Sequence, residues 1–486
     1  MKPQITSLKP TKIWKNFNDL TKIPRPSKSE QKAVDFINDF GKKLGFETVK
    51  DNIGNTVIRK PATAGMEGKK TVIFQSHLDM VPQKNVDKEH DFKKDPIQAY
   101  VDGDWVTADG TTLGADNGIG VAVIMSVLES VDIEHGPVEA LFTIDEETGL
   151  TGASSLKPEM LKGDILLNLD SEDEGELYIG CAGGINAHVT FSYGAEKIPD
   201  NHIPYQVSVG GFKGGHSGLD IHLGRGNAII ILIRLLWRAT FKCNVRLSDV
   251  NGGSLRNAIP REAFATIVVP KEKEDEFLKF IKGYESMLKE EYRTIEPDFS
   301  IKAEKTGMPE GIIDDETTKK IISAIYTCPN GVIRMSRDME DLVETSSNLA
   351  VVKTDFKKVK VECLLRSSLD SAKEDLANRI QSLFELASAE VMFEGEYPGW
   401  KPDLDSEILD VAKNVYNNKF GSIPHIKAVH AGLECGIIGG IYPNLDMISM
   451  GPTIRGAHSP DEKVLIESVS KFWEYLIEIL KNIPDK

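Results

Sequence analysis

The sequence predicts an α/β fold in which a mostly parallel sheet, flanked by helices, is interrupted by an inserted α+β domain. Three continuous apolar segments alternate with helical segments, and strands that are apolar throughout are typical of parallel sheets covered on both faces. These strands are expected at 71–75, 138–144 and 165–169. The pattern changes near Gly183 and returns near Trp400, so the middle of the chain is expected to be an insertion.

One discontinuous domain is expected to comprise residues 1–182 and 400–486. The inserted domain is expected to comprise residues 183–399. Strands of the insertion alternate polar and apolar residues, and helices are expected at 227–241 and 275–292. A strand–helix–strand–strand–helix–strand order predicts a ferredoxin-like layer. A second, looser copy of this order is expected to follow, with helices at 317–326 and 373–387.

Composition excludes several function classes for this chain of 486 residues. Its formal net charge of −16 provides no basic field for nucleic acid or an anionic membrane. The five cysteines form no Cys-x-x-Cys motif, and the first residues contain no apolar signal segment. The most apolar segment, 228–237, is too short to span a bilayer and is expected to be a buried helix. A cytoplasmic location is therefore expected.

Polar side chains follow each of the three predicted parallel strands. His77 and Asp79 follow the first, the triplet Asp145–Glu147 follows the second, and Asp170 follows the third. An isolated acidic triplet is more often a solvated turn. Ligands of open α/β sheets, however, bind beyond the carboxyl ends of the strands, so a shared site is the preferred interpretation.

Two further residues suggest that this site binds metal. Asp116 lies in the loop Gly-Ala-Asp-Asn-Gly, and His458 precedes the last predicted helix. Two imidazoles with several carboxylates suit zinc, although cobalt and manganese accept the same ligands. So many acidic groups suggest two ions that share a bridging carboxylate, roughly 3.5–4 Å apart, because two dications would offset the repulsion.

The motifs around these residues resemble the di-zinc metallopeptidase family that includes carboxypeptidase G, peptidase T and the aminoacyl-histidine dipeptidases. The resemblance covers nearly the whole chain, with no departure at a metal position, and implies the zinc-peptidase type of sheet with an inserted lid domain. The segments 76–81 and 430–436 and the chain length look most like the aminoacyl-histidine dipeptidase branch. Members of that branch hydrolyse Xaa-His dipeptides such as carnosine.

The resemblance also implies metal-site roles. Asp116 would bridge two Zn²⁺ ions, with His77 and Asp170 completing one site and Glu147 and His458 the other. Two further residues would be catalytic. Asp79 would orient the ring of His77 and raise its basicity, and Glu146 would be the general base that activates a zinc-bound water and passes its proton to the leaving amine.

Three lid residues are candidates for substrate binding by the same resemblance. His216 would stabilise the oxyanion, often from a partner subunit, which implies a homodimer through the lid. Asn257 and Arg366 would hold the substrate's carbonyl or its carboxylate, which a guanidinium binds bidentately. His216 is otherwise interpreted as a turn histidine, and Arg366 as a surface or ion-paired residue.

The expected function is thus metal-dependent hydrolysis of small peptides. One alternative is an amidohydrolase that cleaves N-acyl amino acids on the same scaffold, and another is a metal-binding protein without activity. The sequence predicts no role for His430, Glu434 or Asp145.

Overall fold

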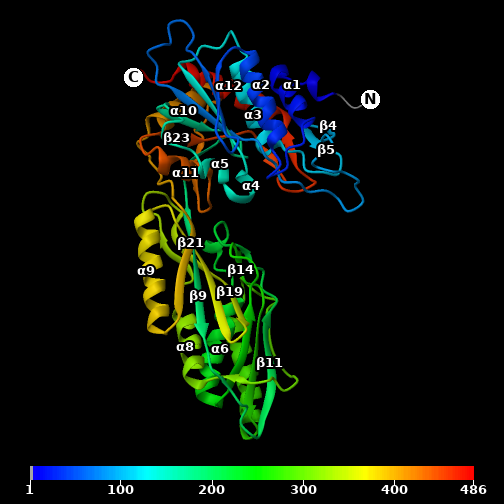
Figure 1. The fold of residues 1–486 in the computed structure, drawn as a ribbon, viewed down its shortest axis with the longest axis vertical. Coiled ribbons are helices and arrows are strands. Elements are labelled where there is room, and N and C mark those ends of the chain that lie inside the picture. Colours follow the sequence, from blue (N-terminus) through cyan, green and yellow to red (C-terminus); the bar gives the residue numbers. More distant parts are fainter. Residues whose placement is uncertain (1–3) are drawn as a thin grey trace. The chain divides into compact units, whose positions relative to one another are not determined.

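The computed structural model describes residues 4–486 and divides into two compact units. The first contains residues up to 180, 400–428 and 433–486; the second contains 181–399 and 429–432. In Figure 1 the first unit accordingly combines blue and cyan segments with orange and red ones, while the second is green to yellow. The segment 429–432 differs from the sequence-based boundary because the amide of Ala182 donates to the carbonyls of Val429 and Ala431.

An eight-stranded mixed sheet forms the centre of the first unit. Its strands, in spatial order, are β1 (Glu47–Lys50), β2 (Thr56–Lys60), β6 (Val138–Thr143), β3 (Val72–His77), β7 (Ile165–Asn168), β23 (Asp446–Ser449), β8 (Glu176–Cys181) and β22 (His425–Val429). The four central strands β6, β3, β7 and β23 are parallel. The expectation of a mostly parallel sheet is confirmed for this centre, whereas β1, β2 and β8 pair antiparallel.

The central strands of this sheet are mostly apolar, and helices cover both of its faces. All residues of β3, β6 and β7 are buried. The main helices of this unit are α1 (Thr11–Thr21), α2 (Gln31–Lys43), α3 (Ala115–Leu128), α10 (Glu407–Phe420), α11 (Glu434–Ile441) and α12 (Ile466–Lys481). The short helices α4 (Glu146–Gly149) and α5 (Thr151–Ser154) follow β6. A small second sheet comprises β4 (Ala99–Asp102), β5 (Trp105–Ala108), β24 (Ile454–Arg455) and β25 (Lys463–Leu465).

The second unit contains two interlocked ferredoxin-like layers in one antiparallel sheet. The first layer comprises β11 (His202–Gly210), α6 (Ala228–Cys243), β13 (Arg246–Gly252), β15 (Ala263–Pro270), α7 (Glu274–Glu291) and β16 (Ser300–Lys305). The second comprises β9 (Gly183–Ser192), α8 (Asp315–Thr327), β19 (Val343–Asp355), β20 (Lys358–Ser367), α9 (Asp370–Leu386) and β21 (Glu390–Tyr397). β18 (Gly331–Met335) pairs with β19.

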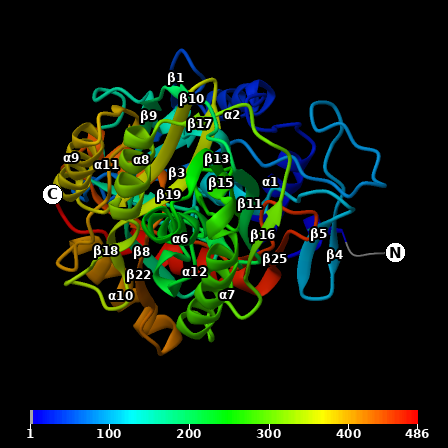
Figure 2. The same ribbon diagram turned by 90° about the horizontal axis from the view of Figure 1, so that it is seen from below.

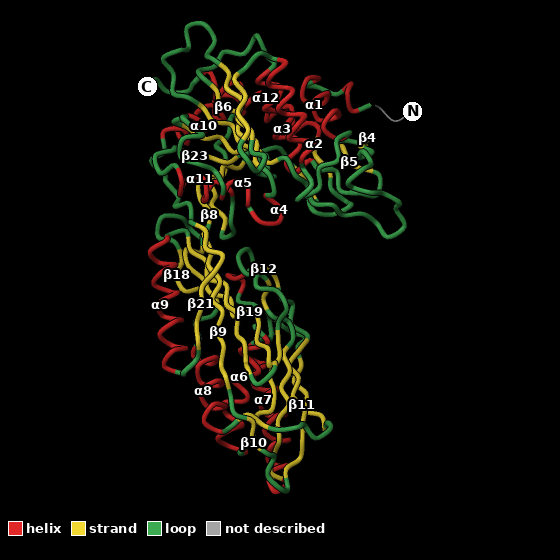
Figure 3. Tube along the Cα trace, in the orientation of Figure 1, coloured by secondary structure: helices red, strands yellow, loops and turns green. Residues whose placement is uncertain are grey.

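Both layers have the same strand order, so the duplication expected from the sequence is present. The orders are β16-β11-β15-β13 and β21-β9-β20-β19. The helices expected for the second copy do follow the first copy, as α8 and α9. Its first strand, β9, does not, because it precedes the whole first copy. Figures 2 and 3 show α6, α7 and α8 on one side of the long strands.

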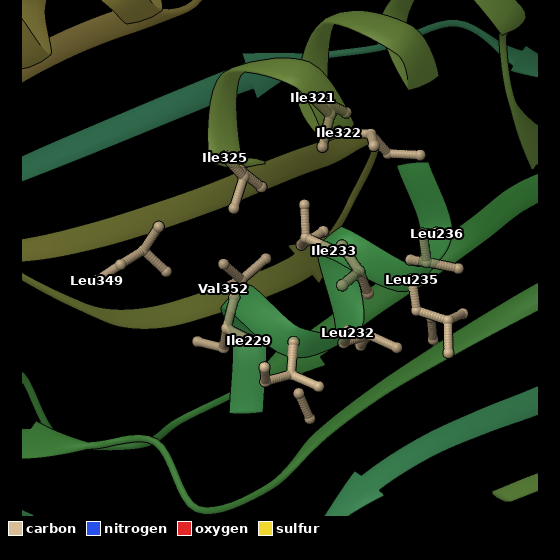
Figure 4. Packing of buried hydrophobic residues seen from close by; sticks show 14 of the residues in the cluster. Ile229, Leu232, Ile233, Leu235, Leu236, Ile321, Ile322, Ile325, Leu349 and Val352 are labelled. Carbon is tan, nitrogen blue, oxygen red and sulfur yellow. The ribbon is translucent and has the colours of Figure 1, made fainter. Parts of the chain in front are cut away.

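The segment 228–237 is a buried helix, as expected, and its packing shows what stabilises the second unit. Leu232 and Ile233 of α6 are fully buried, and they lie with Ile321 and Ile325 of α8 and Val352 of β19 in one apolar cluster (Figure 4). Across the described residues 4–486, every helix is too short or too polar to cross a membrane.

We expect Leu232→Ala to lower the free energy of unfolding of the second unit by about 2–5 kcal/mol, since it leaves a cavity among these side chains. Phe241→Ala on the same helix is the control, because Phe241 is 63% exposed. Chemical denaturation followed by circular dichroism measures both. Equal midpoints for the two variants would contradict the packing described.

Candidate metal centre

The ends of the parallel strands bring the predicted ligands together. His77 is the last residue of β3, Glu147 lies in α4 directly after β6, and Asp170 lies two residues beyond β7. Asp116 is the second residue of α3, and His458 lies in the loop between β24 and β25. Two clusters contain predicted ligands alone, His77–Asp116–Asp170 and Asp116–Glu147–His458, and Asp116 belongs to both. A third cluster, His77–Glu146–Glu147, also contains the predicted base Glu146.

Asp116 presents one carboxylate oxygen to each histidine. Its Oδ1 lies 3.0 Å from Nε2 of His77, and its Oδ2 lies 3.2 Å from Nε2 of His458. Asp170 Oδ1 lies 3.2 Å from the same nitrogen of His77, and Glu147 Oε2 lies 2.9 Å from that of His458. Nε2 of each histidine therefore faces two carboxylate oxygens, although a single N–H can donate a good hydrogen bond to only one of them.

Buried oxygens in these clusters fit metal ligation. Among the described residues, none donates a hydrogen bond to Glu147 Oε1, and Asp170 Oδ1 has only the His77 nitrogen that Asp116 also faces. Leaving such atoms unsatisfied in the interior is costly, and oxygen and imidazole nitrogen are donors that zinc, cobalt and manganese accept. The donor set thus fits two divalent cations that share Asp116.

The electrostatics of the cluster also favour cations. Burial and the charges of Asp116 and Glu147 raise the pKa of Asp170 to about 6, despite His77. Burial raises the pKa of Glu146 well above its usual value, with Asp170, Glu434 and Glu147 contributing. Hydrogen bonds to Asp116 and Glu147 raise the pKa of His458 to about 11. Positive charge at this position would relieve the repulsion among the carboxylates.

Asp79 links the ends of two neighbouring strands. Its Oδ1 lies 3.4 Å from Nδ1 of His77 and accepts the amide of Glu146 at 3.0 Å, while Oδ2 accepts the hydroxyl of Ser27 at 2.8 Å. Burial opposes the charged form, but these partners lower the pKa of Asp79 to about 2. Asp79 is therefore an anion that contacts His77 and orients the start of α4.

Asp145, for which the sequence predicted no role, shapes the turn that carries the two glutamates. Its backbone is left-handed, with φ of 51°, and its carboxylate accepts the hydroxyls of Thr148 and Thr151. Another acidic cluster of the first unit comprises Glu30, Asp79 and Asp145. All three side chains accept hydrogen bonds from nearby groups of the chain. These hydrogen bonds account for this fourth cluster without a metal ion.

Glu434, also without a predicted role, is buried in the first unit. Its Oε2 accepts from Gln75 at 2.5 Å and from Thr143 at 2.8 Å. Gln75 and His77 lie on the same face of β3. Glu434 therefore contacts the face of the strand that carries the predicted metal ligand His77. Burial raises the pKa of Glu434 to about 7.

The three predicted substrate residues lie in the second unit. Nδ1 of His216 accepts the amides of Gly218 and Leu219, at 3.1 and 3.0 Å. Arg366 is 5% exposed and donates from Nη1 to the hydroxyl of Tyr397 at 2.9 Å. Asn257 is exposed, and its carbonyl accepts the amide of Ser217.

His430 joins this group in the second unit. Its Nε2 lies 2.7 Å from the hydroxyl of Ser346. Burial and the neighbouring charge of Arg366 lower the pKa of His430 to about 3, so its ring is neutral.

Comparison with known proteins decides the family. Residues 73–482 match the model of peptidase family M20/M25/M40. The chain belongs to this peptidase family. It is 45% identical to the cytosol non-specific dipeptidase of Escherichia coli over 483 residues, covering 99% of this chain and 100% of that one. The expected membership in a metallopeptidase family is confirmed.

Solved structures agree with this family. The aminoacylhistidine dipeptidase of Vibrio alginolyticus is 49% identical, covers 100% of this chain and 99% of its own, and has a TM-score of 0.95. The aminopeptidase PepT of Bacillus cereus shares the fold, with a TM-score of 0.58 at 17% identity, over 98% of this chain and 99% of its own. The expected zinc-peptidase type of α/β fold is thereby confirmed.

Some residues at the site were missed from the sequence. Ser27 contacts Asp79, while Arg25 and Glu462 bind the backbone of the ligand-bearing loops. Glu462 follows His458 by four residues, and this proximity was a signal that could have identified it.

We expect His77→Ala to lose bound metal, because its Nε2 faces carboxylates of one cluster directly. Elemental analysis of the purified protein measures the metal content. His202→Ala is the control, since His202 lies in β11 of the second unit. Unchanged metal content in the His77 variant would contradict the ligand set.

Proposed function

We propose that this peptidase is a metal-dependent dipeptidase, with Xaa-His dipeptides such as carnosine among its substrates. The observation that carries the proposal is Asp116, which presents one oxygen to each of two histidines and thereby suits two cations. The names of the two relatives support dipeptides as substrates. They differ on specificity, one being called non-specific and the other aminoacylhistidine, so hydrolysis beyond Xaa-His is also expected.

Two Zn²⁺ ions are the proposed cofactors, and Co²⁺ or Mn²⁺ would be held by the same donors. His77 and Asp170 would hold one ion, Glu147 and His458 the other, and Asp116 both. When bound, such ions polarise the scissile carbonyl and lower the pKa of water to about 7.

Asp79 and Glu146 would be the residues that prepare and move the proton. Asp79 lies beside Nδ1 of His77, where it would fix the tautomer that leaves Nε2 available as a ligand. Glu147 is 2.9 Å from His458, which leaves its neighbour Glu146 as the proposed general base. A carboxyl suits this role, because the same group must accept the proton of the attacking water and give it to the leaving amine.

The second unit would supply the substrate contacts. Because Nδ1 of His216 accepts two amides, its neutral ring carries the proton on Nε2, where it can donate to an oxyanion. Burial and Arg366 lower the pKa of His216, which favours this neutral form. Arg366 and Asn257 would bind the substrate's carboxylate or carbonyl. We also propose a homodimer through the second unit, and a cytosolic location in line with the Escherichia coli relative's name.

We expect Glu146→Gln to lower kcat by about 10²–10⁴-fold, since the amide cannot accept the proton, while metal content stays at the wild-type level. Glu159→Gln, an exposed substitution in the same unit, serves as the control. Steady-state kinetics and elemental analysis on the same preparations test this. Near-normal kcat in the Glu146 variant would contradict the base assignment.

We expect turnover of β-Ala-His, Gly-His and other dipeptides, and far slower turnover of N-acetyl amino acids. A hydrolysis panel of these compounds, with the metal-loaded protein, tests the proposal. Preference for the N-acetyl compounds would instead indicate an amidohydrolase, and metal binding without turnover would indicate a non-catalytic protein.

A further inference from the structure

A buried carboxylate gathers the backbone that carries Asp116. Glu462 is 2% exposed. Its Oε2 accepts the amides of Leu113 and Gly114, at 2.8 and 2.9 Å, and its Oε1 accepts those of Ala115 and Asp116, at 2.7 and 3.1 Å. Four consecutive amides thus point at one side chain, so the position of the loop follows that of Glu462.

A buried guanidinium binds the carbonyls of the same region. Arg25 is 2% exposed, and its Nη1 donates to the carbonyls of Leu78 and Asp79, both at 2.9 Å. Its Nη2 donates to the carbonyl of Gly114 at 2.5 Å. Arg25 therefore ties the segment of Asp79 to the loop of Asp116, and Gly114 is bound on its amide side by Glu462.

The glycines of this loop make room for the guanidinium. A Cβ at Gly114, whose φ is 69°, or at Gly118 would lie 2.6 Å from Nη2 of Arg25. A side chain at either position would displace the guanidinium or the loop. The Gly-Ala-Asp-Asn-Gly sequence is thereby explained by Arg25 as well as by the metal site.

We propose that Arg25 and Glu462 are positioning residues that hold Asp116 and Asp79 in the geometry required for metal binding and turnover. The proposal rests on the proposed function. Removing both charges from water is costly, and a well-packed apolar pair would often stabilise a fold as much. These two side chains instead fix the position of particular backbone groups. Glu462 accepts amides of the loop that carries Asp116, and Arg25 donates to carbonyls of that loop and of the segment that carries Asp79.

Glu462→Gln separates this role from simple packing, since it keeps the shape of the side chain. The amide group would present its own N–H donors to two of the four loop amides, so those two hydrogen bonds are lost. Arg25→Lys is the second variant, because a lysine keeps the charge but lacks the fork that reaches three carbonyls at once. This variant keeps the test available should Glu462→Gln fold poorly.

Glu139→Gln is the matched control. Glu139 is also a buried carboxylate of the first unit, 3% exposed, and accepts the amides of Lys162 and Gly163 and a bond from Arg59. It lies near the start of β6, whereas the metal centre follows the end of that strand. This variant should lose stability without a change in metal affinity.

The experiment titrates metal-free wild type and variants with Co²⁺ against a competing chelator, and records the visible spectrum of bound Co²⁺ and the unfolding midpoint. We expect about 10–100-fold weaker Co²⁺ binding and an altered spectrum for Glu462→Gln and Arg25→Lys, as for residues that orient metal ligands. Kinetics of the loaded enzymes should show lower kcat with KM little changed.

Wild-type affinity and spectrum in folded Glu462→Gln or Arg25→Lys would overturn the proposal, as would an equal loss of affinity in Glu139→Gln. Dipeptide hydrolysis by the wild type is assayed separately. Its absence would contradict the proposed function, whereas the Co²⁺ comparison alone decides the role of Arg25 and Glu462.

Discussion

Repulsion among carboxylates is the constraint on which the first unit depends. The parallel strands β3, β6 and β7 end at one edge, and each is followed there by acidic residues. Asp116 and Asp170 lie within reach of one histidine nitrogen, and Asp116 and Glu147 within reach of another. Without positive charge nearby, burial and this repulsion raise the pKa values of Asp170 and Glu146. Two cations bound between these carboxylates would offset their repulsion and would be attracted by each of them.

The surrounding structure limits how far these groups can relax. Asp79 accepts the amide of Glu146 and contacts His77, Asp145 closes the turn after β6, and Glu462 holds four amides before α3. These contacts hold backbone amides as well as side chains. The carboxylates therefore stay together although they repel each other. Such contacts around the ligands preorganise a site for metal binding.

Much of this site could be predicted because its signals are local. An apolar strand followed by His-x-Asp, or by an acidic triplet, carries both the strand and its functional end in one short segment. Arg25 gave no such signal, and Glu462 gave only its position four residues after His458. Both bind backbone atoms of residues remote in the sequence, and backbone groups look alike in every sequence. Glu434 was missed for a related reason, since its partners Gln75 and Thr143 lie in distant strands.

The fold shows the same division. The parallel centre was predictable from strands that are mostly apolar, whereas the antiparallel edges depend on pairing between short, partly exposed strands such as β1. In the second unit the alternating pattern predicted the ferredoxin-like order. It did not reveal that β9 belongs to the second copy, because strand pairing across more than a hundred residues leaves no local pattern.

The central claim is that the gathered carboxylates hold two cations bridged by Asp116. Anomalous X-ray diffraction from crystals of the zinc-loaded protein tests it most directly. The account predicts two zinc peaks roughly 3.5–4 Å apart, with one oxygen of Asp116 on each. A single peak, or two peaks of which at least one has no oxygen of Asp116 as a ligand, would contradict it.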